Sequence, residues 1–169
     1  MSLERLITGL TDADISFVVV GMVAGQLYGS RITTYDLDIV YDPSDDNITR
    51  LAEHLLGLDA YVKEAWPNEG VTSGFSRNVL AREQSLTLGT REGEIDLLHR
   101  IDGVGDYRAV REQSVSLRLE SGRDVQVITL QALIASKRAS NREKDRLHIV
   151  DLEAIEQLGG SARPRNLGA

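Results

Sequence analysis

The chain has 169 residues, of which 41% are apolar and 27% charged, and its 19 Lys and Arg residues against 26 Asp and Glu residues give a formal charge of −7. This length buries roughly 70% of the unfolded surface and predicts one domain with one core, over residues 1–158, followed by a disordered tail over residues 159–169. The apolar clusters are strand-sized and predict no membrane span, and the N-terminus lacks the pattern of a secretory signal. The absence of cysteine excludes disulfides and thiol chemistry and favours a cytoplasmic protein, while the acidic charge disfavours general coating of DNA.

The first half of the chain predicts helices that alternate with strands. Apolar residues recur at helical spacing near the N-terminus, and the continuous β-favouring residues after them indicate a buried strand. Gly29 stands where a short helix needs a left-handed residue, and Ser44 stands where a helix needs an N-cap. The expected elements are a helix over residues 3–10, a strand over 15–20, a helix over 22–28, a strand over 36–41 and a helix from Ser44 to Gly57.

The second half of the chain predicts further strands and then two helices. Residues 94–99 alternate, with Ile95 and Leu97 on one face, and the Gly-containing loop over 120–124 indicates a hairpin. The expected elements are strand-like pieces within 60–64 and 79–90 around an unassigned connection over 67–74, a strand over 94–99, a hairpin of 115–119 with 125–128, a helix capped by Thr129 and a last helix through 147–155. This order predicts an α+β (α/β-like) fold, with a mixed sheet flanked by helices and further helices at the C-terminal end.

Two aspartates lie two positions apart in the predicted strand over 36–41. Asp36 and Asp38 therefore point to the same face, roughly 7 Å apart by strand rise, and such a pair repels unless a cation lies between its members. Mg²⁺ suits the pair, because it takes hard oxygen ligands and completes its shell with water and substrate phosphates. Asp96, on the polar face of its strand, is the third candidate, and three carboxylates can hold metal ions that clamp the attacking and leaving oxygens of a nucleotidyl transfer. Asp-x-Asp pairs also occur by chance at solvent-facing strand ends, which is the alternative interpretation.

A glycine and a serine upstream of the aspartate pair offer groups that bind phosphate. Gly29 and Ser30 supply backbone N–H groups and a hydroxyl shortly before Asp36, where a residue without Cβ permits close approach. The alternative is a glycine that ends a helix, followed by a turn serine.

A basic run lies late in the chain. It contains four cations within eight residues, at Lys137, Arg138, Arg142 and Lys144. Lys137 and Lys144 share one face if the helix is unbroken. A solvated helix face is the alternative interpretation of this run.

The segments Val20–Ala24 and Leu27–Val40 together resemble the signature of the polymerase-β-like nucleotidyltransferase superfamily, in which a glycine-containing turn precedes an Asp-x-Asp strand. The run Arg31–Asp38 is most similar to a small bacterial branch that includes abortive-infection type toxin nucleotidyltransferases. Met22 departs from the pattern, since the family often has a second glycine or a serine there.

The later blocks of the superfamily also have counterparts in this chain. Gly93–Leu98 fits the strand with the third carboxylate, residues 133–145 are similar to a late basic helix, and the resemblance covers about residues 15–155. It implies Mg²⁺ as cofactor and a nucleoside triphosphate such as ATP as substrate, with Asp96 either a metal ligand or the group that activates the attacking hydroxyl. The implied catalytic residues are Asp36, Asp38, Asp96 and Lys137, of which the three aspartates hold the metal, and the implied nucleotide-binding residues are Gly21, Gly29, Ser30, Arg31, Arg142 and Lys144.

The resemblance leaves the acceptor hydroxyl open among an RNA end such as that of tRNA, a small molecule and a protein. It also leaves room for a toxin that is held by an antitoxin protein, and for a nucleotide-binding regulatory or partner-binding domain of the same fold. A metal-dependent nuclease is a further alternative, because Glu94 and Asp96 resemble the acidic strand of some nucleases. Those enzymes need a nearby acidic-x-Lys strand, however, and Val125–Ile128 has neither an acid nor a lysine.

Overall fold

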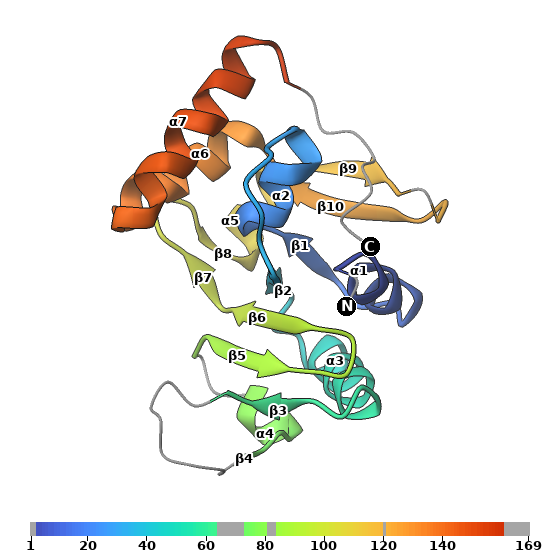
Figure 1. The fold of residues 1–169 in the computed structure, drawn as a ribbon. Helices are drawn as coiled ribbons and strands as arrows, with labels where there is room; N and C mark the ends of the chain where they lie inside the picture. Colours follow the sequence, from blue (N-terminus) through green and yellow to red (C-terminus); the bar gives the residue numbers. More distant parts are fainter. Residues whose placement is uncertain (1–2, 64–72, 81–83, 120, 161–169) are drawn as a thin grey trace.

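A mixed β-sheet runs through the molecule, with helices packed against it (Figure 1). The computed structural model describes residues 3–63, 73–80, 84–119 and 121–160. The helices are α1 (Leu3–Asp12), α2 (Gly21–Tyr28), α3 (Asp45–Gly57), α4 (Arg77–Leu80), α5 (Tyr107–Glu112), α6 (Leu130–Ser140) and α7 (Glu143–Gln157). The strands are β1 (Phe17–Val19), β2 (Asp36–Tyr41), β3 (Tyr61–Val62), β4 (Ser73–Gly74), β5 (Leu86–Gly89), β6 (Glu94–Leu98), β7 (Arg100–Ile101), β8 (Gly105–Asp106), β9 (Ser114–Arg118) and β10 (Asp124–Ile128).

Within the described residues, eight strands form one sheet in the order β4-β3-β5-β6-β2-β1-β10-β9. β1 pairs with β10 and β2 pairs with β6 in parallel, whereas the other neighbours are antiparallel. β7 and β8 form a separate antiparallel ladder. The sheet is therefore mixed, and β2 and β6 lie next to each other near its middle.

The two faces of β2 and β6 differ in polarity because side chains alternate along a strand. Leu37 and Ile39 on β2, and Ile95 and Leu97 on β6, are fully buried in the hydrophobic core. The residues between them are polar and only half-buried. The buried face fixes the register of the strands, since a slip by one residue would turn these four apolar side chains to the other face.

The helices gather at different parts of the sheet. α1, α2 and α5 contact β2, and α3 packs on α4. Figure 1 shows α6 and α7 beside each other at one end of the molecule, away from β3 and β4. α7 makes its main contact with α6, and Asp145 in the first turn of α7 pairs with Lys137 of α6.

The predicted α+β fold with a mixed sheet is confirmed. The hairpin appears as β9 paired with β10, and the predicted cap of α6 forms because Thr129 Oγ1 accepts a hydrogen bond from the N–H of Ala132 at 3.3 Å. Ser44 occupies the N-cap position of α3, but its side chain makes no capping hydrogen bond.

Some elements differ from the predictions. Arg77–Leu80 forms the short helix α4 where a strand-like piece was expected from residue 79, and the next described strand is β5, Leu86–Gly89. The sequence patterns did not predict β7, β8 or α5. The N-cap of α5 is Asp106, whose side chain accepts a hydrogen bond from the N–H of Ala109 at 3.2 Å. Glycines and charged residues interrupt the apolar period in this segment, so the pattern is too weak to indicate a helix.

The C-terminal end of α7 is closed by backbone hydrogen bonds. The N–H groups of Gly159 and Gly160 donate to Glu156 O and Ile155 O at 3.0 and 2.9 Å. The rest of the predicted tail, residues 161–169, lies outside the described residues, so its disorder stays a prediction. None of the described helices combines the length and the apolar character that a membrane crossing requires.

Candidate active site

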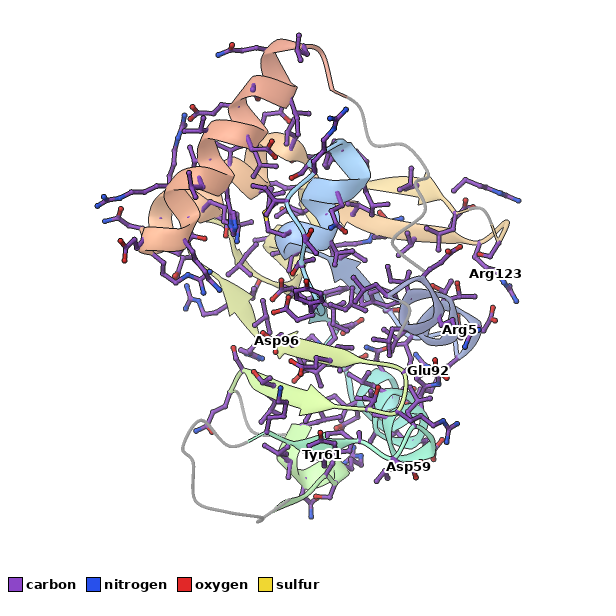
Figure 2. The ribbon with its side chains drawn as sticks, viewed as in Figure 1. Arg5, Asp59, Tyr61, Glu92, Asp96 and Arg123 are labelled. Atoms are coloured by element: carbon purple, nitrogen blue, oxygen red, sulfur yellow. The ribbon has the colours of Figure 1, made fainter. Side chains whose placement is uncertain are left out.

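Three aspartates converge on the polar face of the sheet centre. Asp38 on β2 lies directly opposite Asp96 on β6 in the parallel register, and Asp36 is one pleat before Asp38. A carboxylate oxygen from each of the three residues lies within 4.8 Å of those from the other two. Figure 2 shows Asp96 on β6, the strand next to β2.

Burial and mutual repulsion change the acidity of the acid cluster. Burial, followed by the charges of Asp36 and Asp96, raises the pKa of Asp38 to about 7, against the lowering effect of Lys137 and Lys144. Burial also raises the pKa of Asp96, with a contribution from the charge of Asp36. The fold thus holds these carboxylates where their negative charge is disfavoured, which a bound cation would reverse.

Gly21 allows the backbone to approach the acid cluster closely. It begins α2 with φ of +63°, and a Cβ at this position would collide with the carboxylate of Asp38. The N–H of Val20 also donates to Asp38 O at 3.0 Å, which joins the end of β1 to β2. A glycine is required at position 21 for both its backbone angle and its contact.

A buried carboxylate organises the basic side of the site. Asp145 is fully buried, and its Oδ1 lies 3.3 Å from Lys137 Nζ and 3.6 Å from His148 Nδ1. Its Oδ2 accepts hydrogen bonds from Ser140 Oγ at 2.6 Å and from Arg142 Nε at 3.0 Å. Burial raises the pKa of Asp145, but these hydrogen bonds and the charges of Lys137 and Arg142 outweigh it and hold the pKa well below its usual value.

Lys137 is the cation most enclosed by this arrangement, with only 8% of its surface exposed. His148 is half-buried, and burial together with the charge of Lys137 lowers its pKa, although Asp145 acts in the opposite direction. Lys137 is therefore the buried basic side chain that pairs with Asp145.

A pocket of about 130 Å³ brings the acidic and basic sides together. Seven of the residues proposed from the sequence line it: Gly21, Asp36, Asp38, Asp96, Lys137, Arg142 and Lys144. Asp145 lies behind this lining, where it holds Lys137 and Arg142. The geometry can bind a cation on one side and an anion on the other.

Gly29, Ser30 and Arg31 are not brought to the described lining of this pocket. Gly29 ends α2 with φ of +123°, and the eight-residue helix separates it from Gly21 by roughly 12 Å at 1.5 Å per residue. The hydroxyl of Ser30 is buried and accepts a hydrogen bond from the N–H of Ile32 at 3.1 Å. These residues are close to Asp36 in the chain, but they lie at the far end of α2. The loop after them runs back from there to β2.

The basic run does not form one helix. Asn141 has φ of +48°, in the left-handed region, and ends α6, so that Lys137 lies on α6 and Lys144 on α7. Both lysines still line the pocket, because α7 turns back against α6 and Asp145 holds Lys137 from the other side of the break. Arg138, in contrast, pairs with Glu153 of α7.

Sequence reasoning missed the three further polar side chains of the lining: Thr34, Ser136 and His148. The hydroxyl of Thr34 donates to Asp36 Oδ1 and fixes one carboxylate of the acid cluster. His148 lies three residues after Asp145 and therefore on a neighbouring position of the helix surface, a spacing that could have indicated its contact with that carboxylate.

The acid cluster fits a hard divalent cation. Its donors are carboxylate oxygens, which Mg²⁺ prefers, and Asp96 Oδ1 is buried without a hydrogen-bond partner. A buried carboxylate oxygen with no donor is costly unless a cation satisfies it. Asp36, Asp38 and Asp96 are therefore the described residues that could hold the metal.

Comparison with known proteins bears on the fold. No protein-family model and no curated protein sequence matches the chain. The lincosamide antibiotic adenylyltransferase LnuA, solved with lincomycin bound, superposes with a TM-score of 0.60 and 13% identity, over 90% of this chain and 95% of LnuA. ANT(2'')-Ia, solved in complex with adenylyl-2''-tobramycin, gives a TM-score of 0.57 and 12% identity, over 94% of this chain and 87% of its own. The chain has the nucleotidyltransferase fold.

A third solved structure extends this nucleotidyltransferase fold beyond the two antibiotic-modifying enzymes. An antigenic nucleotidyltransferase-like protein from Paracoccidioides brasiliensis gives a TM-score of 0.53 and 16% identity, over 92% of this chain and 74% of its own. The likeness covers nearly the whole chain in each case, so the fold implied by the sequence resemblance is confirmed.

Proposed function

We propose that the protein is a Mg²⁺-dependent nucleotidyltransferase of the cytoplasm that moves a nucleoside monophosphate from a nucleoside triphosphate to a hydroxyl, with release of pyrophosphate. One observation carries the proposal: three carboxylates lie within 4.8 Å of one another at a pocket that also contains Lys137, in a nucleotidyltransferase fold. The acid cluster is suited to the metal and the basic side to the phosphates.

Asp36, Asp38 and Asp96 would hold Mg²⁺, which supplies positive charge to the phosphate oxygens and aligns the attacking and leaving groups. In the transfer, the acceptor oxygen forms a bond to the α-phosphorus, and the bond from that phosphorus to the bridging oxygen of pyrophosphate breaks. Asp96 takes the proton of the acceptor hydroxyl, because its carboxylate lies within the acid cluster at which that hydroxyl is held for attack. Asp96 thus serves as both a ligand and a base in this proposal.

Lys137 stabilises the charge that develops on the leaving pyrophosphate, and Arg142 and Lys144 bind the same phosphates. Asp145 supports these roles, because its carboxylate holds Lys137 and Arg142 at 3.3 and 3.0 Å. A cation held in place before the reaction needs no reorganisation when charge appears on the leaving group.

The remaining nucleotide-binding residues divide into two groups. Gly21 lets the start of α2 approach the phosphates beside Asp38, as its contact with that carboxylate supports. We assign Gly29 and Ser30 an indirect part, because the Ser30 hydroxyl accepts from the N–H of Ile32 at 3.1 Å and so shapes the loop that leads to Thr34. Arg31 is exposed on that loop and is free of the core, which suits a contact with the outer part of the nucleotide.

The test is incubation of the intact protein with each α-labelled triphosphate and Mg²⁺, with and without total RNA or a cell extract, in wild type and Asp38→Asn. We expect Mg²⁺-dependent incorporation of label in wild type and loss of at least about a thousandfold in the variant, since the metal loses a ligand. Equal incorporation in both proteins would contradict the mechanism. Triphosphate binding without any transfer would favour the alternative of a regulatory domain.

The finer assignments implied by the sequence resemblance rest on the same chemistry. We propose ATP as one accepted triphosphate, and a toxin restrained by an antitoxin protein as the biological setting. Controlled expression tests the toxin role: growth arrest in wild type that is absent in Asp38→Asn supports it, whereas equal growth of both cultures refutes it.

A further inference from the structure

We propose that the exposed sheet face beside the acid cluster binds the acceptor, and that this acceptor is a hydroxylated, ring-bearing small molecule that is neutral or cationic. The proposal rests on the proposed function and specifies its substrate class. The face is formed by Tyr61, Lys63, Thr87, Gly89 and Glu94, and is called the acceptor platform here.

The register of the strands makes the acceptor platform continuous with the acid cluster. One cross-strand row runs from Asp36 through Glu94 and Gly89 to Tyr61, and the next runs from Asp38 through Asp96 to Thr87. Residues that lie opposite each other share a face of the sheet. Two strand spacings of about 4.8 Å place β3 roughly 10 Å from β6, which is the span of one or two sugar-sized rings.

Tyr61 is displayed flat on this face. Its ring lies on Gly89, where an added Cβ would collide with ring atoms, and 40% of the residue is exposed. Figure 2 shows Tyr61 and Asp96 in the same half of the molecule, with β5 between their strands. The face of an aromatic ring carries partial negative charge from its quadrupole. It therefore attracts either a cation or the C–H groups on the face of another ring.

The charges of the acceptor platform disfavour phosphate. Its described cation, Lys63, is already paired with Glu94 at 2.5 Å, and the three carboxylates of the acid cluster adjoin the pair. An RNA end carries a negative charge for every nucleotide. The carboxylates would repel this charge, and the described platform has no unpaired cation that could neutralise it. Carboxylate and hydroxyl groups of Glu94 and Thr87 instead suit the hydroxyl or ammonium groups of an unphosphorylated ring compound.

The test offers two acceptor pools to the intact protein with α-labelled triphosphates and Mg²⁺. One pool contains lincomycin and tobramycin as hydroxylated ring compounds, and the other contains total RNA. We expect label in the small-molecule pool. We expect Tyr61→Ala to raise the KM for the labelled compound about tenfold or more, and to change the KM for the triphosphate less than about twofold.

Two variants separate a binding role from a folding role. Tyr61→Phe keeps the ring on Gly89 and should retain a KM for the acceptor near that of wild type. Glu94→Gln removes a carboxylate charge from the acceptor platform and should raise the KM for a cationic acceptor such as tobramycin. Leu56→Ala, at an exposed position of α3, is the control that should leave both KM values unchanged.

Label in RNA, label in neither pool, or an unchanged KM in Tyr61→Ala would each overturn the acceptor platform. Binding of the Mg²⁺–triphosphate to wild type and to Asp38→Asn, measured by calorimetry, tells this failure from that of the proposed function. If Asp38-dependent binding persists and label enters RNA or a component of a cell extract, the assignment of the acceptor alone is refuted. If it is absent, the nucleotidyl transfer itself is refuted.

Discussion

Asp38 lies half-buried among two other carboxylates, and burial with their charges raises its pKa to about 7 from the ordinary value of 3.8. Because the folded state binds the proton more tightly, the free energy of unfolding of the metal-free protein falls as the pH rises from about 4 to about 7. The total loss is on the order of 4 kcal/mol at most. The ionised Asp38 carboxylate that the proposed metal site needs therefore destabilises the metal-free protein.

The variant Asp38→Asn tests this cost. At pH 8 without metal we expect it to unfold at a higher temperature than wild type, with the difference shrinking at pH 5, where Asp38 is protonated in the folded state. Addition of Mg²⁺ should raise the melting temperature of wild type and leave that of the variant unchanged. A variant less stable than wild type at pH 8 would show that the carboxylate is not under repulsion.

Gly21 offers a second test at the residue scale. In Gly21→Ala the new Cβ would meet the Asp38 carboxylate, and the backbone at φ +63° disfavours a side chain. We expect loss of transfer activity and of stabilisation by Mg²⁺, with a reduction in the free energy of unfolding of about 1–3 kcal/mol. Gly57→Ala is the matched control, because a Cβ there meets no atom within 4 Å, and it should be neutral or slightly stabilising. Equal behaviour of the two variants in thermal melts and metal titrations would contradict the assigned contact.

Among the elements, α6 and α7 are joined at the site by the Asp145 carboxylate, which contacts Lys137 of α6 as well as Arg142 at the start of α7. In Asp145→Asn the charge of Lys137 stays buried without its partner, and we expect a loss of about 3–5 kcal/mol by urea denaturation at pH 7. Ser140→Ala, which removes one hydrogen bond to the same carboxylate, should cost about 1 kcal/mol.

The effect of Asp145→Asn should depend on pH. Since the folded-state pKa of Asp145 is held below its ordinary value, the stability that its charge contributes is present above about pH 4 and is lost as the pH falls toward the folded-state pKa. The gap between wild type and variant should therefore narrow at pH 3. A gap that is constant from pH 7 to pH 3 would mean that the carboxylate acts by packing alone.

The two faces of α7 provide a further prediction. Leu147 and Val150 are 75% and 67% exposed, whereas Leu152 is fully buried. Leu152→Ala should reduce the free energy of unfolding by about 2–5 kcal/mol because it leaves a cavity, and Leu147→Ala should change it by less than about 0.5 kcal/mol. Similar losses in both variants would show that the exposed face is covered in solution.

At the scale of the whole molecule, local patterns predicted what depends on a single element. The alternation through Asp36 and Asp38 placed both carboxylates on one face, and Asp96 could be assigned to the polar face of its own strand by the same rule. That Asp96 lies opposite Asp38 could not be read from the sequence, because the parallel register of β2 with β6 depends on long-range pairing.

Features that depend on a chain reversal were the ones that sequence patterns did not resolve. Asn141 is a residue type that can end a helix in the left-handed conformation, but the basic residues on both sides of it gave the pattern of one helix. Gly29 and Ser30 are near Asp36 in the chain but at the far end of α2 from Gly21. His148 lies three residues after Asp145 on the same helix, but the burial of that carboxylate, which gives the contact its weight, depends on how α7 packs.

The fate of each phosphorus atom tests the central claim most directly. The intact protein is incubated with Mg²⁺, an accepting pool and a triphosphate labelled on either the α- or the γ-phosphorus. We expect the α-label in the acceptor and the γ-label in pyrophosphate, in equal amounts, with both lost in Asp38→Asn. Transfer of the γ-label to the acceptor, or release of the γ-label as inorganic phosphate with no α-label in any acceptor, would contradict nucleotidyl transfer.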